Sequence, residues 1–241
     1  MKWRVAVAVS LALLSIAGHA ALRSMRPRPS SAVEESALAV LGGFRAVLSE
    51  VMWFRADRLQ REGRYAELAQ LARALTLAEP HTPEVWCYAA WNLAYNVSVT
   101  MPTPEDRWRW VSSAIRLLRD DGLRLNPTSP ELHRELAWLF ELKLGTDIDS
   151  AAATYREKWR EIAEEAEKAG WESIGMDPRR MEEVERRFGP MDRRDPRYSA
   201  VYWASRGLEN ASGNDRAFLL QIIRQSLMLY AKDRKGEPVG G

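Results

Sequence analysis

The chain contains a single cysteine, Cys87, in 241 residues, so it cannot form an intrachain disulfide. Histidine is also scarce, and none of its three copies has a partner at the spacing of a metal-ligand pair: His19, His81 and His133. The sequence holds no glycine-rich phosphate-binding loop and no nucleophile elbow. We therefore expect no metal, no other cofactor and no catalytic residue, in a protein that is not an enzyme.

A surplus of charge is also missing. The chain has 35 basic and 33 acidic residues, which gives a net charge of +2. Residues 1–20 contain Lys2 and Arg4, so the remainder has 33 of each sign. Arginine pairs such as Arg179-Arg180 are interleaved with Glu and Asp, which is typical of solvated helix faces. The balance predicts no nucleic-acid partner.

Strand patterns are nearly absent, whereas helix starts are clearly marked. Val, Ile and Thr alternate with polar residues only briefly, around residues 97–100. A capping residue followed by Pro at the first helical position recurs along the chain. The starts are Thr82-Pro83, Thr103-Pro104, Ser129-Pro130, Asp177-Pro178 and Asp195-Pro196. They predict an all-α fold with helices at 83–98, 104–121, 130–144, 178–188 and 196–211, besides a helix from Asp149 to Lys168 and a last one to Lys232.

The stretch from Ser49 to Asn96 reads as helix, Gly turn, helix, Pro break, helix. Gly63 and Tyr65 mark the turn, and Pro80 marks the break. Trp86 and Ala90 then take the Trp and small-residue positions of a second unit, and a third unit fits from Pro130. This pattern resembles the tetratricopeptide repeat. The resemblance implies a right-handed solenoid of antiparallel helix pairs that holds a partner on its concave surface.

A wider resemblance covers most of the chain after residue 40. The segments Leu41–Arg45, Trp91–Asn96 and Tyr202–Leu208 are similar to those of uncharacterised bacterial membrane-associated proteins with repeat-like helices. That resemblance implies no particular activity.

The repeat resemblance also implies which side chains line the concave surface, namely those on the first helix of each pair. Carried over, it predicts these partner-binding residues: Trp53, Asp57, Arg61, Glu84, Trp91, Tyr95, Arg134 and Trp138. The alternative for the three tryptophans is a place in the core. Tyr88 and Glu135 replace residues of the family's carboxylate clamp, which argues against recognition of chaperone tails. Asn92 and Asn96 are expected to bond carbonyls of the loop near residues 100–103.

The N-terminus has an apolar run from Val5 to Leu22, preceded by Lys2 and Arg4. It predicts an apolar helix at residues 1–22, either an uncleaved membrane anchor or a cleaved signal segment. The expected organisation is then a linker at 23–32, a helical repeat domain at 33–232 and a flexible tail at 233–241. In both cases the body lies outside the cytoplasm, in the periplasm of a bacterium.

The sequence thus favours a non-enzymatic, membrane-tethered scaffold that binds a protein or peptide. The alternative is an enzyme or small-ligand carrier with a pocket between the repeats and the segment 171–198. The polar residues available to such a pocket are Asp192, Arg193, Arg194 and Asp195, beside Tyr198.

Overall fold

The computed structural model describes residues 50–234, so the expectations for residues 1–22, 23–32 and 235–241 lie outside the described residues. The chain divides into two compact units, residues 1–62 and 63–241, and this boundary falls inside the predicted domain 33–232. In the first unit, residues 50–61 form a helix. Gly63 follows it with φ +68°, the left-handed conformation that Gly adopts most readily.

The second unit is all-helical, and residues 50–234 contain no strand. Its elements are α3 (Tyr65–Ala78), α4 (Pro83–Trp91), η1 (Asn92–Val97), η2 (Ser98–Thr100), α5 (Pro104–Arg116), η3 (Leu117–Gly122), α6 (Leu123–Leu125), α7 (Pro130–Trp138), η4 (Leu139–Leu144), α8 (Ala152–Ala169), η5 (Trp171–Ile174), α9 (Pro178–Phe188), α10 (Pro196–Leu208) and α11 (Gly213–Arg234). The expectation of an all-α protein is therefore confirmed. None of the helices in the described part is long and apolar enough to cross a membrane.

Side-chain caps explain where α5, α7, α9 and α10 begin. Thr103 accepts a hydrogen bond from the Asp106 backbone N–H (3.1 Å), and Ser129 accepts one from Leu132 (3.2 Å). Asp177 and Asp195 each accept one from the N–H two residues on, at 2.8 Å. Each bond satisfies a donor that has no partner within the first helical turn. Among the five starts marked by Pro, Thr82 is the exception, because its side chain makes no such bond.

Three of the predicted helices continue as wider π-helical turns. Six residues in each of η1, η3 and η4 adopt this form directly after α4, α5 and α7. Asn92 begins η1, and its side-chain amide donates to the Tyr88 carbonyl (2.9 Å). The Asn96 amide donates in turn to Asn92 Oδ1 (2.6 Å). The expectation that these amides bond the loop near residues 100–103 is wrong, because they bond within their own helix.

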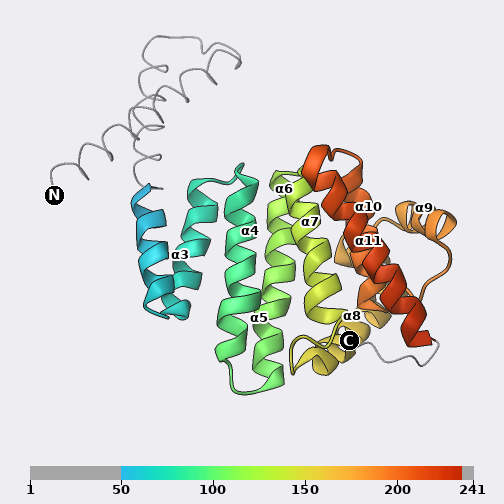
Figure 1. Ribbon diagram of the computed structural model, residues 1–241, viewed down its shortest axis with the longest axis horizontal. Coiled ribbons are helices and arrows are strands. Elements are labelled where there is room, and N and C mark those ends of the chain that lie inside the picture. The colour runs from blue at the N-terminus through green and yellow to red at the C-terminus, as the bar shows by residue number, and fades with distance from the viewer. Residues whose placement is uncertain (1–49, 235–241) are drawn as a thin grey trace, which may run out of the picture. The chain divides into compact units, whose positions relative to one another are not determined.

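Helix α10 packs against α7 and α11, which Figure 1 shows beside it. Nearly every residue of α10 is buried, including Tyr198, Tyr202 and Trp203. Close approach to α7 requires a glycine, since a Cβ on Gly207 would lie 2.9 Å from the Cβ of His133. On the other side, α4 packs against α3, α5 and α7. This arrangement places one face of α4 and η1 against α7 and η4.

Candidate binding site

The predicted binding residues fall in both units. Five lie in the second unit, on α4, η1 and α7: Glu84, Trp91, Tyr95, Arg134 and Trp138. The other three lie on the helix at 50–61 in the first unit: Trp53, Asp57 and Arg61. There Arg61 and Asp57 form an exposed ion pair one helical turn apart, and Trp53 is half-buried. Each group is considered within its own unit.

Three of the five residues in the second unit form an aromatic stack across two helices. The ring centroids of Trp91 and Tyr95 are 6.3 Å apart, and those of Tyr95 and Trp138 are 5.4 Å apart, each pair with an interplanar angle of 28°. Such offset stacks are favourable beyond the area that they bury. All three side chains are half-buried. The tryptophans therefore lie at the edge of the core, between the two placements that the sequence left open.

Two carboxylates lie beside this stack. Glu135 and Glu141 flank Trp138 at intervals of three residues, and they are only 9% and 5% exposed. Glu135 Oε1 is buried and has no hydrogen-bond partner among the described residues. The Glu141 carboxylate likewise forms no ion pair with the part of the chain that the structure describes. We call Trp91, Tyr95, Glu135, Trp138 and Glu141 the aromatic-acidic cluster.

Burial shifts the ionisation of these groups. Desolvation raises the pKa of Glu135 to about 7, although the Arg134 charge opposes the shift. Desolvation alone raises the pKa of Glu141 to about 7. The Tyr95 hydroxyl is also buried without a partner in the described part of the chain. Burial raises its pKa, and the charges of Glu135 and Glu141 raise it further. Both carboxylates thus act on the same hydroxyl.

The far side of Tyr95 is closed by a buried ion pair. Lys143 Nζ lies 2.6 Å from Asp149 Oδ2 and 4.9 Å from the centre of the Tyr95 ring. Asp149 also accepts hydrogen bonds from the Tyr155 hydroxyl (3.2 Å) and from Arg107 Nη1 (3.4 Å). Burial alone would raise the pKa of Asp149, but the hydrogen bonds from Lys143 and the Ala151 N–H lower it overall. This pair is therefore charged and satisfied.

Arg134 and Glu84 differ in whether their side chains are free to contact a partner. The Arg134 guanidinium pairs with Asp215 on α11 and lies 5.8 Å from the centre of the Phe218 ring. It is therefore engaged inside the chain, rather than free for the carboxylate of a partner as its predicted role requires. Glu84 is exposed at the start of α4.

Cys87 is a half-buried neighbour of the cluster. Its thiol lies 3.7 Å from the Glu131 carbonyl, to which it donates a weak hydrogen bond. Burial raises the pKa of the thiol, and the Glu135 charge adds to the shift. A protonated thiol is a poor nucleophile and a poor metal ligand.

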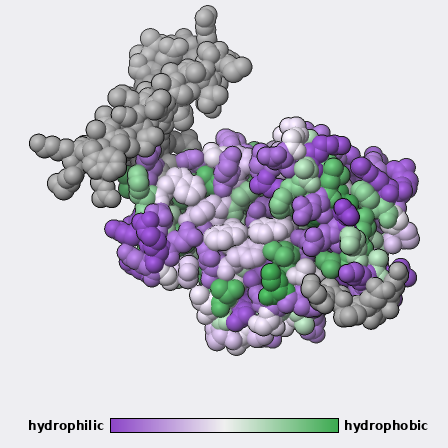
Figure 2. Space-filling view, viewed as in Figure 1, coloured by the Kyte–Doolittle hydropathy of each residue, from purple (hydrophilic) through white to green (hydrophobic). Residues whose placement is uncertain are grey.

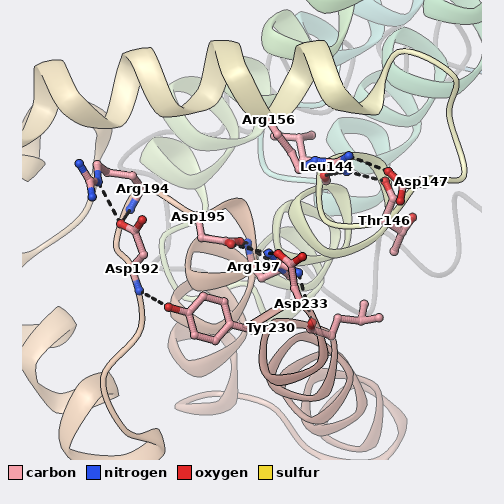
Figure 3. Close-up of polar contacts among 11 residues, drawn as sticks. Leu144, Thr146, Asp147, Arg156, Asp192, Arg194, Asp195, Arg197, Tyr230 and Asp233 are labelled. Atoms are coloured by element: carbon pink, nitrogen blue, oxygen red, sulfur yellow. Dashed lines mark hydrogen bonds and ion pairs between the residues drawn. The ribbon is translucent and has the colours of Figure 1, made fainter. Parts of the chain in front are cut away.

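Figure 3 shows three of the polar residues that the sequence assigned to an alternative pocket, Asp192, Arg194 and Asp195. Arg197 holds Asp195 through two hydrogen bonds (2.9 and 2.6 Å) and Asp233 through a third (2.6 Å). Arg194 donates to Asp192 Oδ1 at 3.0 Å, and the Tyr230 hydroxyl accepts from the Asp192 N–H at 2.8 Å. These contacts fasten the loop before α10 to the end of α11.

The remaining arginines of this region are also engaged. Arg193 forms a two-pronged pair with Glu185 at 2.6 and 2.9 Å. Arg156 donates to the Leu144 and Thr146 carbonyls and to Asp147, as Figure 3 shows. Among residues 50–234, no group of three His, Cys, Asp or Glu side chains could hold a metal ion. The charges around residues 192–197 thus join elements of the chain to one another.

Exposed apolar side chains gather elsewhere, on α11. Phe218, Leu220 and Met228 are large hydrophobic residues with substantial exposure. Figure 2 shows green atoms over this side of the molecule, with purple atoms between them. Arg134 covers part of this surface through its contact with Phe218.

No family model, curated protein or solved structure matches this chain. The contacts within the chain are therefore the basis for distinguishing one possible function from another.

The repeat resemblance also assigns Glu141 to the concave surface and Glu135 to a clamp position, but sequence reasoning did not foresee that both residues are buried, and it missed the buried pair beside them. One signal could have found them. Pro130 and Trp138 lie 47 residues after Pro83 and Trp91, so the two segments carry Pro and Trp at the same spacing. The spacing Glu135, Trp138, Glu141 then places two acids on either side of an aromatic that is paired across the helices.

Proposed function

We propose that this chain is a non-enzymatic scaffold that binds a protein or peptide partner through the face formed by α4, η1 and α7. The observation that carries the proposal is the stack of Trp91, Tyr95 and Trp138, in which half-buried rings come from two different helices. Aromatic side chains at the edge of a core offer a large contact area with little conformational entropy to lose. Such residues dominate the binding energy of many protein interfaces.

We further propose that the helices are stacked as a right-handed solenoid of antiparallel pairs, as in tetratricopeptide repeats. Ala90 and Ala137 support this, since both small positions are fully buried. The 47-residue interval between Trp91 and Trp138 supports it as well, because equivalent positions then recur on α4 and α7. In such a solenoid Trp53, Asp57 and Arg61 would occupy the equivalent positions of the first copy.

The proposed scaffold is tethered to a membrane by residues 1–22, with its body on the extracytoplasmic side. The support is the apolar run Val5–Leu22 in the sequence. The test is fractionation of cells, followed by protease treatment of intact spheroplasts. Protease-sensitive protein in the membrane fraction is the expected result, and protein protected inside the cell would overturn the orientation.

Binding through the stack is tested by crosslinking in native membranes, with Trp91→Ala and Trp138→Ala compared with wild type. Trp110→Ala on α5 is the matched control, since Trp110 is also half-buried and lies outside the stack. Truncation of a central interface tryptophan commonly weakens binding by about 2 kcal/mol, roughly thirtyfold. We expect both stack variants to lose specific crosslinks that the control retains.

Thermal unfolding of the same variants separates an interface role from a core role. A core tryptophan loses about 3–5 kcal/mol of stability when cut to Ala. Lost crosslinks with a near-normal melting midpoint support the proposal. Retained crosslinks in both stack variants would contradict it.

No contact favours the enzyme or carrier alternative over this proposal, because Asp192, Arg193, Arg194 and Asp195 are each engaged by other residues of the chain.

A further inference from the structure

The outer face of α11 carries exposed apolar and basic side chains. The inner face, which includes Leu219, Ile222 and Ile223, is buried where α11 packs against α10 and α7. On the outer face Leu220 and Met228 are 42% and 50% exposed. Single exposed apolar residues are ordinary on protein surfaces. What distinguishes this face is the order in which its apolar and basic side chains follow one another.

Residues four apart form two adjacent rows along this face. The first row alternates apolar and basic side chains, and we call it the α11 row: Leu220, Arg224, Met228 and Lys232. The second row lies beside it: Ala217, Gln221, Gln225 and Leu229. A hollow of about 710 Å³ lies along these rows, and the described residues that line it all belong to them. Rows of this spacing are the ridges against which a second helix packs its own side chains.

The basic residues of the α11 row have no acidic partner in residues 50–234. Helix α11 contains two acids, and both are engaged inside the chain: Asp215 pairs with an arginine of α7, and Asp233 pairs with an arginine of α10. Arg224 and Lys232 are exposed and form no ion pair with the described part of the chain. The row is therefore positively charged, which is complementary to an acidic partner.

We propose that the α11 row is a second docking surface, which binds an acidic amphipathic helix of a protein partner. Arg224 and Lys232 lie about 12 Å apart along the helix axis, since each residue rises by about 1.5 Å. A partner helix covers this distance in about two turns, so it can place one carboxylate beside each of the two bases. Its apolar side chains then contact Leu220 and Met228. Helix α11 carries none of the residues of the aromatic stack, so this surface is additional to the one proposed above.

Two other occupants fit this face less well. A second copy of the chain in a symmetric antiparallel pair would place two basic rows against each other, and neither row contains an acid. A helix that lies on a membrane inserts an apolar face and keeps its basic side chains on the opposite face. Arg224 instead lies between Leu220 and Met228 on one row, so insertion of these two residues would bury its charge. A protein helix supplies a carboxylate at that point.

The test is fluorescence anisotropy with a labelled helical peptide in which Leu and Glu alternate every four residues, titrated with the full-length protein in detergent. A second peptide replaces each Glu by Gln, and a third replaces each Glu by Lys. The variants are Arg224→Glu and Lys232→Glu, singly and together. The control is Arg73→Glu on α3, which makes the same change of charge at another exposed helical position.

We expect each single variant to weaken binding of the Glu peptide by about fivefold or more, and the control by less than about twofold. The Gln peptide should bind wild type about tenfold more weakly than the Glu peptide does. The double variant should bind the Lys peptide and reject the Glu peptide, because the charges have been exchanged.

Equal weakening by the control would show a general attraction between net charges and overturn the inference. Failure of wild type to bind the Glu peptide would overturn it too. The substituted side chains are exposed, so the melting midpoints of the variants should match that of wild type. Binding of the Lys peptide by the double variant is a gain that unfolding cannot produce.

A photoreactive side chain distinguishes the possible occupants of this face. Gln225, which lies on the second row, is replaced by p-benzoylphenylalanine, and the full-length protein is irradiated in phosphatidylglycerol nanodiscs with the Glu peptide. Crosslinks to the peptide support the inference. Crosslinks to lipid, to a second copy or within the chain, with none to the peptide, would overturn it in favour of a membrane surface, a dimer or a segment of the chain itself.

Discussion

Two neighbouring groups of buried charges in this molecule are arranged in opposite ways. Lys143 and Asp149 form an ion pair at 2.6 Å, supported by the Tyr155 hydroxyl and Arg107. Glu135 lies on α7, and Glu141 lies with Lys143 on η4, which continues α7. Neither glutamate has a cation of its own. Both groups approach Tyr95. Since a buried charge without a partner destabilises the fold, the second group lowers the stability of the fold when it is ionised.

The comparison separates the role of the paired charges from the role of the unpaired ones. The paired charges fix how η4 and the loop before α8 are joined, because Asp149 also accepts from the Ala151 N–H at 2.9 Å. The carboxylates of Glu135 and Glu141 form no such link between elements of the described chain. Four substitutions and pH changes test this difference, and they are taken here from the largest expected effect to the smallest.

Removal of Asp149 should have the largest effect. Asp149→Ala leaves the Lys143 ammonium buried without a counter-charge, and loss of one partner of a buried pair costs about 3–5 kcal/mol. Urea unfolding followed by circular dichroism measures this loss. Asp147→Ala is the control, since Asp147 pairs with Arg156 in an exposed position and should lose less than about 1 kcal/mol. Similar losses in both variants would mean that the buried pair does not differ from an exposed one.

Neutralising Glu135 should raise the free energy of unfolding, whereas removal of Asp149 should lower it. Glu135→Gln removes a desolvated charge, and a pKa raised from 4.5 to about 7 corresponds to a penalty on the order of 1–3 kcal/mol at pH 8. We expect the free energy of unfolding to rise by an amount in this range. A fall of more than about 1 kcal/mol would show that the carboxylate has a stabilising partner.

The pH dependence of stability is a second test of the penalty on the Glu135 charge. The folded-state pKa of Glu135 lies above its unfolded value, so the penalty is absent below about pH 4.5 and grows as pH rises to about 7. The stability difference between Glu135→Gln and wild type should therefore shrink from pH 8 toward zero below about pH 4.5. Unfolding curves at several pH values measure it. A difference that stays constant with pH would exclude ionisation as its cause.

An exposed ion pair should have the smallest effect on the free energy of unfolding. Lys158 and Glu161 lie three residues apart on α8, with an N–O distance of 2.9 Å, and both are largely solvated. Glu161→Gln should change the free energy of unfolding by less than about 0.5 kcal/mol. A larger change would mean that exposed pairs in this protein are stronger than exposed pairs usually are.

The sequence predicted what depends on a few neighbouring residues. Helix starts at Pro104, Pro130, Pro178 and Pro196 were confirmed, because a cap and its acceptor lie two or three residues apart. The end of the helix that begins at Pro196 was less accurate, at 208 rather than 211. Helix ends carry weaker local signals than capped starts.

The site was predictable only in part, because its chemistry depends on distant contacts. The repeat resemblance assigned Trp91, Tyr95 and Trp138 to one surface, and the three rings lie together in a stack. It could not foresee that Arg134 pairs with Asp215, 81 residues away. It also gave no measure of burial for Glu135, whose character depends on what covers it rather than on its neighbours in sequence.

The π-helical turns of η4 have a consequence for any attempt to shorten or realign this chain. Each residue of an α-helix turns the next side chain by about 100°. A wide π-helical turn takes up one residue more than an α-helical turn. A single deletion within Leu139–Leu144 would therefore let the backbone return to α-helical pairing and leave the later side chains on their present faces. An alignment that treats this segment as uninterrupted α-helix assigns the side chains beyond it to the wrong faces.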